Sequence, residues 1–161
     1  MSLWPLFEGR RFREALVAAQ QILAADPKNP NARMVHGQAH LFLGESAEGI
    51  AEIRTDTELD PGNNFPLGWL GYAYGVAGQR KEALEVLARL ERLSRTSYVQ
   101  PYLFALVHLG LGGKDEAFRW LEQAVNEHSD ELLFVRVDPA LDSLRDDPRF
   151  KVLLRRMGIK A

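Results

Sequence analysis

Two histidines lie four residues apart and could together bind a metal ion. His36 and His40 would share one face of a helix, and histidines with this spacing occur in zinc sites. The zinc-protease signature also needs a glutamate directly after the first histidine, but residues 37–39 read Gly-Gln-Ala. We therefore predict that both side chains pack between helices, as His108 does, and that the chain binds no metal.

The other residues that carry chemistry do not converge on a catalytic arrangement. The glycines recur at regular intervals in the sequence and form no phosphate-binding loop. The acidic residues are placed at predicted helix starts and on polar helix faces, without a nucleophile and a base beside them. We predict that the chain is not an enzyme and that it uses no cofactor.

Arginines form three groups along the sequence. The groups are Arg10, Arg11 and Arg13; Arg89, Arg92 and Arg95; and Arg145, Arg149, Arg155 and Arg156. Such groups could contact an acidic partner or nucleic acid. The 20 basic and 22 acidic residues nearly balance, however, and leave a net charge of −2. We therefore interpret the arginines as parts of solvated helix faces and expect no direct nucleic-acid binding.

A repeat of 34 residues organises the elements that would position these side chains. Small residues recur at this interval at one slot: Ala15, Gly49, Ala83 and Ala117. A second slot repeats glycine at the same interval: Gly44, Gly78 and Gly112. Asp-Pro pairs at residues 26–27 and 60–61 follow the same spacing. Self-similarity at a fixed period is typical of solenoid proteins.

Each period divides into two helical patterns. Before Gly78, the residues Leu67, Leu70, Gly71 and Tyr74 follow the spacing of one helix face. After Gly78, a second face is formed by Ala83, Leu84, Leu87 and Leu90. Glycine allows the chain to reverse because it tolerates positive φ, and the residue before a proline leaves helical space. The sequence therefore predicts antiparallel helix pairs that approach closely at the small residues.

This helix–turn–helix unit of 34 residues resembles the tetratricopeptide repeat (TPR) family. The third unit carries the resemblance best, through Leu67, Leu70, Gly71, Tyr74, Ala83 and Leu87. The second unit departs from the family pattern at Arg33, His36, His40 and Gly49. The resemblance implies an all-α fold, a right-handed αα-superhelix of about 3.5 to 4 helix-pair repeats. We expect one domain over residues 1–161, with repeats near 1–29, 30–63, 64–97 and 98–128 and a helical cap at 129–161.

The C-terminal tail leaves the period after Asn126. Asp138-Pro139 and Asp147-Pro148 each resemble a helix N-cap followed by proline at the first helical position. The last helix is predicted to be amphipathic and to end at Gly158, with an apolar face of Phe150, Val152, Leu153, Leu154 and Met157. Such a helix would cap the solenoid, whose last repeat otherwise exposes apolar surface.

The tail also resembles the ending that follows the last TPR in many bacterial multidomain proteins. Those proteins include winged-helix regulators, nucleotide cyclases and Ser/Thr kinases. The chain begins partway through a repeat. Both features imply a C-terminal module of a larger bacterial signalling or regulatory protein, where it would serve as a protein-binding scaffold.

The first helix of each unit lines the ligand-facing, concave side in the TPR family. The corresponding slots here are mostly apolar or aromatic: Asn31, Met34, Gln38, Leu41, Phe42, Phe65, Tyr72, Val76, Val99, Tyr102 and Leu106. Family members that clamp a terminal carboxylate add lysine and arginine, which are missing from these slots. The resemblance therefore implies an apolar peptide or protein segment as the partner. Two alternatives remain open: the groove binds this partner, or it is filled by the chain's own tail or by another copy in a homodimer.

The composition limits the cellular compartments in which we expect the chain. It has no cysteines, which excludes disulfides and fits a reducing compartment. The start, MSLWPLFEGRR, lacks the pattern of a signal peptide. No stretch approaches the roughly 18 apolar residues of a membrane span. We expect a cytoplasmic protein without membrane contact.

Overall fold

The computed structural model describes residues 3–128, 132–133 and 135–159, and its regular elements there are helices. The first half contains α1 (Trp4–Glu8), α2 (Phe12–Ala25), α3 (Pro30–Phe42), α4 (Ser46–Leu59) and α5 (Phe65–Val76). The second half contains α6 (Arg80–Ser94), α7 (Pro101–Gly110), α8 (Lys114–Asn126), the 3-10 helix η2 (Pro139–Leu144) and α9 (Pro148–Arg156). The fold class is therefore all-α, as the periodicity predicts.

The glycines that recur every 34 residues reverse the chain between paired helices. Gly44, Gly78 and Gly112 have φ angles of 84°, 75° and 79°, the left-handed region that favours glycine. The amide after each glycine donates to a carbonyl near the end of the preceding helix; Gln79 N, for example, donates to Tyr74 O at 2.8 Å. This bond closes the helix end. The prediction of glycine reversals between helices is confirmed.

The small residues of the repeat lie where paired helices touch. Ala15, Ala83 and Ala117 are fully buried. A side chain at Gly49 of α4 would place its Cβ 2.6 Å from Leu41 Cδ2 and 2.9 Å from the Gly37 carbonyl oxygen of α3. A Cβ at Gly37 would in turn lie 2.7 Å from Ile53 Cγ1. Close approach of α3 and α4 therefore requires glycine on both helices.

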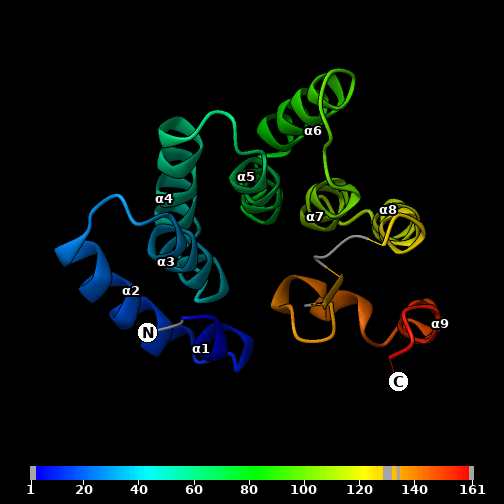
Figure 1. The fold of residues 1–161 in the computed structure, drawn as a ribbon, viewed down its shortest axis with the longest axis horizontal. Helices are drawn as coiled ribbons and strands as arrows, with labels where there is room; N and C mark the ends of the chain where they lie inside the picture. The colour runs from blue at the N-terminus through cyan, green and yellow to red at the C-terminus, as the bar shows by residue number, and fades with distance from the viewer. Residues whose placement is uncertain (1–2, 129–131, 134, 160–161) are drawn as a thin grey trace.

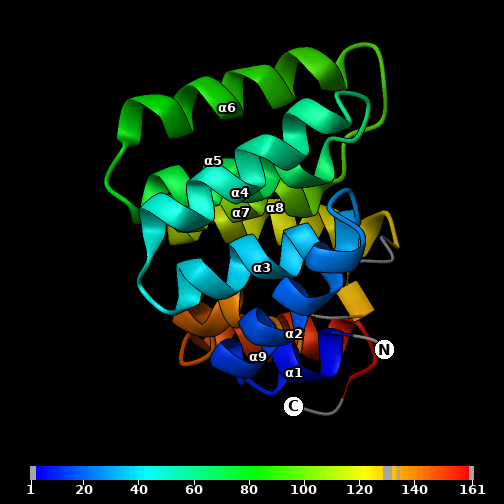
Figure 2. The ribbon, with the colours of Figure 1, turned by 90° about the vertical axis from the view of Figure 1, so that its left-hand side faces the viewer.

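The helices follow one another around an arc (Figure 1). Helices α3, α5 and α7 lie on the inner side of the arc, and α4, α6 and α8 lie on the outer side. Helix α1 and the segment around η2 lie on the concave side, and Figure 2 shows them at the same end of the molecule. The inner helices thus face α1, which belongs to the incomplete first unit, and the C-terminal segment, which lies outside the repeat.

Two proline starts shape the C-terminal segment. The amide of Ala140 donates to Asp138 Oδ1 at 2.8 Å, and the amide of Arg149 donates to Asp147 Oδ1 at 3.0 Å. These bonds satisfy otherwise unpaired amides at the starts of η2 and α9, which confirms both predicted N-caps. A proline also sets the start of α7. Gln100, the residue before Pro101, is extended (ψ 130°), so the helix begins at Pro101.

Helix α9 covers the end of the helix array. Phe150, Leu153 and Leu154 are buried within the main core, which extends from α3 to α9. Val152, which the sequence places on the apolar face, is 52 % exposed, so that assignment is wrong. At 100° per residue, Val152 turns away from the stripe that Phe150, Leu153 and Leu154 share. Gly158 ends the segment with a φ of 73°.

A smaller core joins α1, α2 and α3. Its buried members are Leu3, Ala15, Ala18, Ala19, Ala32 and Val35. None of the described helices is both long enough and apolar enough to cross a membrane.

Candidate functional site

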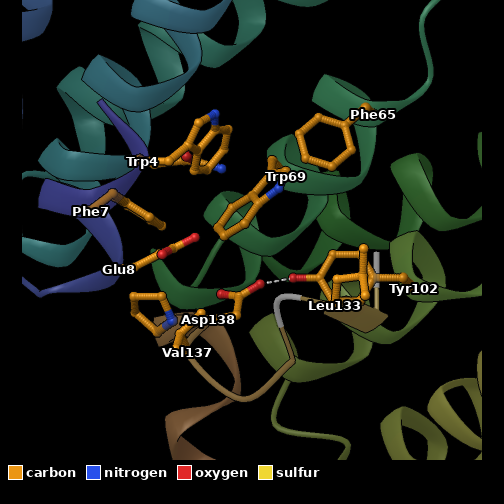
Figure 3. A pocket seen from close by; sticks show the side chains of 11 residues that line it. Trp4, Phe7, Glu8, Phe65, Trp69, Tyr102, Leu133, Val137 and Asp138 are labelled. Atoms are coloured by element: carbon orange, nitrogen blue, oxygen red, sulfur yellow. Dashed lines mark hydrogen bonds between the residues drawn. The ribbon is translucent and has the colours of Figure 1, made fainter. Parts of the chain in front are cut away.

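An apolar pocket of about 270 Å³ lies between α1, the inner helices and the C-terminal segment (Figure 3). Helix α1 contributes Trp4, Phe7 and Glu8, and the inner helices contribute Gln38, Phe65, Trp69 and Tyr102. The remaining lining residues come from the C-terminal segment: Leu133, Val137, Asp138 and Pro139. The wall therefore combines helices of the repeat with a C-terminal segment outside it.

Aromatic packing fixes the wall of this pocket. The rings of Trp4 and Phe7 meet edge to face with centroids 5.9 Å apart. The ring of Trp69 meets that of Tyr72 at 5.5 Å and that of Phe42 at 6.4 Å, both edge to face. Edge-to-face contacts are the favoured geometry of aromatic pairs. The indole of Trp69 is thereby held against the inner helices while it lines the pocket.

A hydrogen bond ties the C-terminal segment to the inner face. The Tyr102 hydroxyl donates to Asp138 Oδ2, shown as the dashed line in Figure 3. Burial raises the pKa of the Asp138 carboxyl above its usual value, although the bonds from Tyr102 and the Ala140 amide oppose this shift. Burial also raises the pKa of Tyr72 to about 12, and the nearby carboxylates of Asp138 and Asp142 add to that shift. Tyr72 therefore keeps its hydroxyl proton near neutral pH.

Two buried polar groups in the wall lack partners. Gln38 is 0 % exposed, and neither its Oε1 nor its Nε2 has a hydrogen-bond partner among the described residues. Trp69 is 2 % exposed, and its Nε1 likewise has no acceptor in that part of the chain. Buried polar groups are nearly always hydrogen-bonded in native proteins. These unsatisfied atoms belong to two residues that line the pocket.

The structure distributes the predicted groove residues over four environments. Gln38, Phe65 and Tyr102 line the pocket. Phe42 and Tyr72 are half-buried beside Trp69. Four are buried in the main core: Met34, Leu41, Val99 and Leu106. Asn31 is exposed at a second depression between α1, α2 and α3, and Val76 is 46 % exposed at the end of α5.

The remaining pocket residues were not among the predicted groove residues. Trp4, Phe7 and Glu8 belong to the incomplete first unit (residues 1–29), and residues 133–139 follow the last unit. Trp69 lies inside the register but off the face used to identify the helix pair. The 34-residue period was an available signal, because it places Trp4, Phe7 and Glu8 in the same slots as the predicted groove residues Gln38, Leu41 and Phe42.

The histidine pair lies between α3 and α4. The rings of His36 and His40 meet edge to face at 4.7 Å, and His40 Nδ1 lies 2.6 Å from Glu45 Oε2. Burial lowers the pKa of His36, an effect that the neighbouring Glu52 carboxylate partly opposes. Within the described ranges no three His, Cys, Asp or Glu side chains form a group suited to a metal ion.

Several grouped arginines join elements of the fold. Arg149 lies over the Phe118 ring at 4.3 Å and pairs with Asp115 at 2.7 Å, which fastens α9 to α8. Arg11 pairs with Glu14 within the first turn of α2. Arg10 and Arg145 both pair with Asp142 of η2. Arg89, Arg92 and Arg95 are exposed, as is Arg155.

No family model matches the chain. No curated protein matches it with a significant score. Its function therefore has to be argued from its own geometry.

Proposed function

We propose that the chain is a non-enzymatic interaction module of the tetratricopeptide-repeat type that binds an apolar peptide or protein segment on its concave side. The 34-residue period, the glycine reversals and the succession of helix pairs support the repeat assignment. By the resemblance of its tail, the module belongs to a larger bacterial signalling or regulatory protein of the cytoplasm. The complete reading frame around this segment would test that setting.

The observation that carries this proposal is the aromatic pocket on the inner side of the arc. Trp4, Phe7, Phe65 and Trp69 line it from α1 and α5. Mostly apolar concave sites with a few polar groups are the usual form of a ligand-binding site. Aromatic side chains also dominate the residues that anchor protein partners. A partner with one apolar anchor residue therefore fits this surface.

Charge favours an apolar partner over an acidic one. Glu8 and Asp138 line the pocket, and no lysine or arginine is among the described residues that line it. A terminal carboxylate would meet these acidic groups without a cation to pair with. Affinity for an apolar segment should depend weakly on salt, because salt screens exposed charge pairs.

The test is a peptide-library screen at low and high salt, followed by titration of the best binders. Phe65→Ala should weaken binding by more than about 1 kcal/mol, because truncated aromatic anchors cost about 2 kcal/mol or more at hot spots. Leu84→Ala is the matched control, since Leu84 is 42 % exposed on α6 and lies outside the pocket. Capture of acidic C-terminal peptides that is lost at high salt would overturn the proposal.

The second candidate function is a homo-oligomerisation module whose concave side is occupied by its own tail or by another copy. Leu133 and Val137 of the C-terminal segment line the pocket, and the Tyr102–Asp138 bond anchors this segment. Light scattering over a range of concentrations separates the two functions. A monomer that persists at high concentration would count against self-association.

A further inference from the structure

The unpartnered amide of Gln38 defines what the pocket can recognise. The side chain comes from α3, lines the pocket and is 0 % exposed. Its Nε2 is a donor and its Oε1 an acceptor, and neither is used within the described part of the chain. A group that satisfies both must present an acceptor beside a donor. A neutral amide has this arrangement.

The indole of Trp69 adds a second donor to the same wall. Its Nε1 has no described acceptor, and an indole N–H can only donate. A carbonyl oxygen has two lone pairs and can accept from Trp69 while it also accepts from Gln38. A carbonyl with an adjacent N–H therefore carries a partner of the right kind for each of these three groups.

Charged head groups fit this wall less well. A carboxylate has no donor for Gln38 Oε1, and it would approach the acidic residues Glu8 and Asp138. An ammonium group has no acceptor for the N–H groups of Gln38 and Trp69. Buried donors without acceptors are strongly disfavoured. Glu8 and Asp138 would attract a cation, but a cation would leave these donors unsatisfied, so the hydrogen-bonding groups favour a neutral amide.

The size of the pocket limits the apolar part of the ligand. Its volume of about 270 Å³ lies just below the usual 300–1,000 Å³ of drug-sized sites. An engineered apolar cavity of about 150 Å³ holds benzene. A single ring or branched alkyl group next to one amide is therefore the expected size.

We infer that the pocket recognises a neutral amide carried by a compact apolar body, with Gln38 and Trp69 as its hydrogen-bonding partners. This inference rests on the proposed function and names what its anchor must carry. A peptide supplies the chemistry as a main-chain amide beside an apolar side chain, and a small molecule supplies it as a free amide.

The test compares three probes with the same benzyl body: 2-phenylacetamide, phenylacetate and 2-phenylethylammonium. Binding is measured by calorimetry and by the shift of the Trp69 indole N–H signal in NMR spectra. The amide should bind at least about tenfold more tightly than either charged probe, which is the scale of one buried hydrogen bond. N-acetylphenylalanine methylamide forms the peptide arm, and tighter binding of this probe would identify a peptide as the source.

Two variants test the named partners. Gln38→Met keeps the side-chain length without the amide, and Trp69→Phe keeps an aromatic ring without the N–H. Each should reduce the preference for the amide by about tenfold. Gln123→Met and Trp120→Phe are matched controls outside the pocket lining and should leave the preference unchanged. If one variant fails to fold by circular dichroism, the other still decides.

The outcomes separate this inference from the proposed function. Equal binding of the three probes, a preference for a charged probe, or an unchanged preference in both variants would overturn the inference. If water rather than a ligand amide satisfies Gln38 and Trp69, the three probes should bind equally. Capture of library peptides without any amide preference would leave the proposed function standing alone. Failure of every probe and every peptide to bind would overturn both.

Discussion

Arg10 and Asp142 join the two ends of the described chain across 132 positions of sequence. Arg10 Nη2 donates to Asp142 Oδ1 at 2.5 Å, and Arg10 Nε donates to Asp142 Oδ2 at 3.2 Å. This fork links the loop after α1 to η2, and both α1 and the start of η2 line the pocket. Arg145 shares the same carboxylate, with its Nε 2.6 Å from Oδ1. The pair therefore bridges two walls of the candidate site.

We predict that breaking this bridge costs little stability. The side chains of Arg10 and Asp142 are 43 % and 44 % exposed, and exposed ion pairs contribute about 0.2–1 kcal/mol. A double-mutant cycle with Arg10→Met and Asp142→Asn, measured by urea unfolding, should give a coupling energy within that range. It should shrink at high salt. A coupling above about 2 kcal/mol would mean that closure of the two ends holds the fold together.

The contact between Gly75 and Gly110 predicts an unusual response to alanine. In an exposed helix, Gly→Ala is stabilising by about 0.5–1 kcal/mol. A Cβ on Gly75 of α5, however, would lie 2.3 Å from the Gly110 carbonyl carbon of α7. Backbone cannot move aside as a side chain can, so Gly75→Ala should destabilise the fold by about 1–3 kcal/mol.

Gly62→Ala provides the control for this prediction. Its Cβ would meet only Asp60 Oδ1, at 3.7 Å. Thermal unfolding should therefore show a lower midpoint for Gly75→Ala and a nearly unchanged one for Gly62→Ala. A Gly75→Ala variant as stable as the parent chain would show that α5 and α7 lie farther apart than the structure places them.

The repeat could be predicted from the sequence because the same helix contacts and chain reversals recur in each unit. Ala83 recurs as a small residue because two helices touch there, and Gly78 recurs because the chain must reverse at positive φ. Local rules of this kind also predicted the N-caps Asp138 and Asp147. Period and capping chemistry are visible in one sequence because they act between near neighbours.

The pocket could not be predicted in the same way. Glu8 and Asp138 line one pocket only because α1 and the C-terminal segment both fold onto the concave side. No spacing rule connects residues so far apart in the sequence. The burial of Met34 and Leu106 has a similar origin, because those slots were assigned by register, whereas burial depends on what packs over them. Long-range packing decided which aromatic residues face the pocket.

Phe150 should be the residue through which α9 stabilises the fold. It is buried in the main core, and the guanidinium carbon of Arg145 lies 5.4 Å from its ring centroid. Phe→Ala at a buried site costs about 3–5 kcal/mol. Phe150→Ala should therefore lower the free energy of unfolding by that amount and promote aggregation, whereas Val152→Ala on the same helix should change it little.

Chemical unfolding monitored by circular dichroism measures both variants. Both substitutions truncate an apolar residue of α9 to alanine, and they differ mainly in how deeply that residue is buried. If both variants lose the same small amount of stability, α9 does not cap the helix array, and the amphipathic pattern of its sequence has another origin.

His36 should make the fold less stable as the pH falls below about 6.5. Burial lowers the pKa of its imidazole in the folded chain, and the attraction of Glu52 only partly offsets this effect. As the pH falls, His36 of the unfolded chain therefore binds a proton near the ordinary histidine pKa of about 6.5, whereas His36 of the folded chain binds it only at a lower pH. The contribution of His36 to stability is present above that pH and is lost as the pH falls toward the lowered pKa. The contribution of one histidine to the free energy of unfolding cannot change by more than about 1.4 kcal/mol per pH unit.

His36→Leu tests this prediction because leucine stays neutral at every pH. Urea unfolding at pH 7.5, 6.5 and 5.5 should show a smaller loss of stability on acidification than in the parent chain. Some loss should remain, because burial also lowers the pKa of His108. The control is His128→Asn, which removes an exposed histidine at a φ of 53° that asparagine tolerates. Parallel pH profiles for His36→Leu and the parent chain would show that protonation of His36 is not coupled to folding.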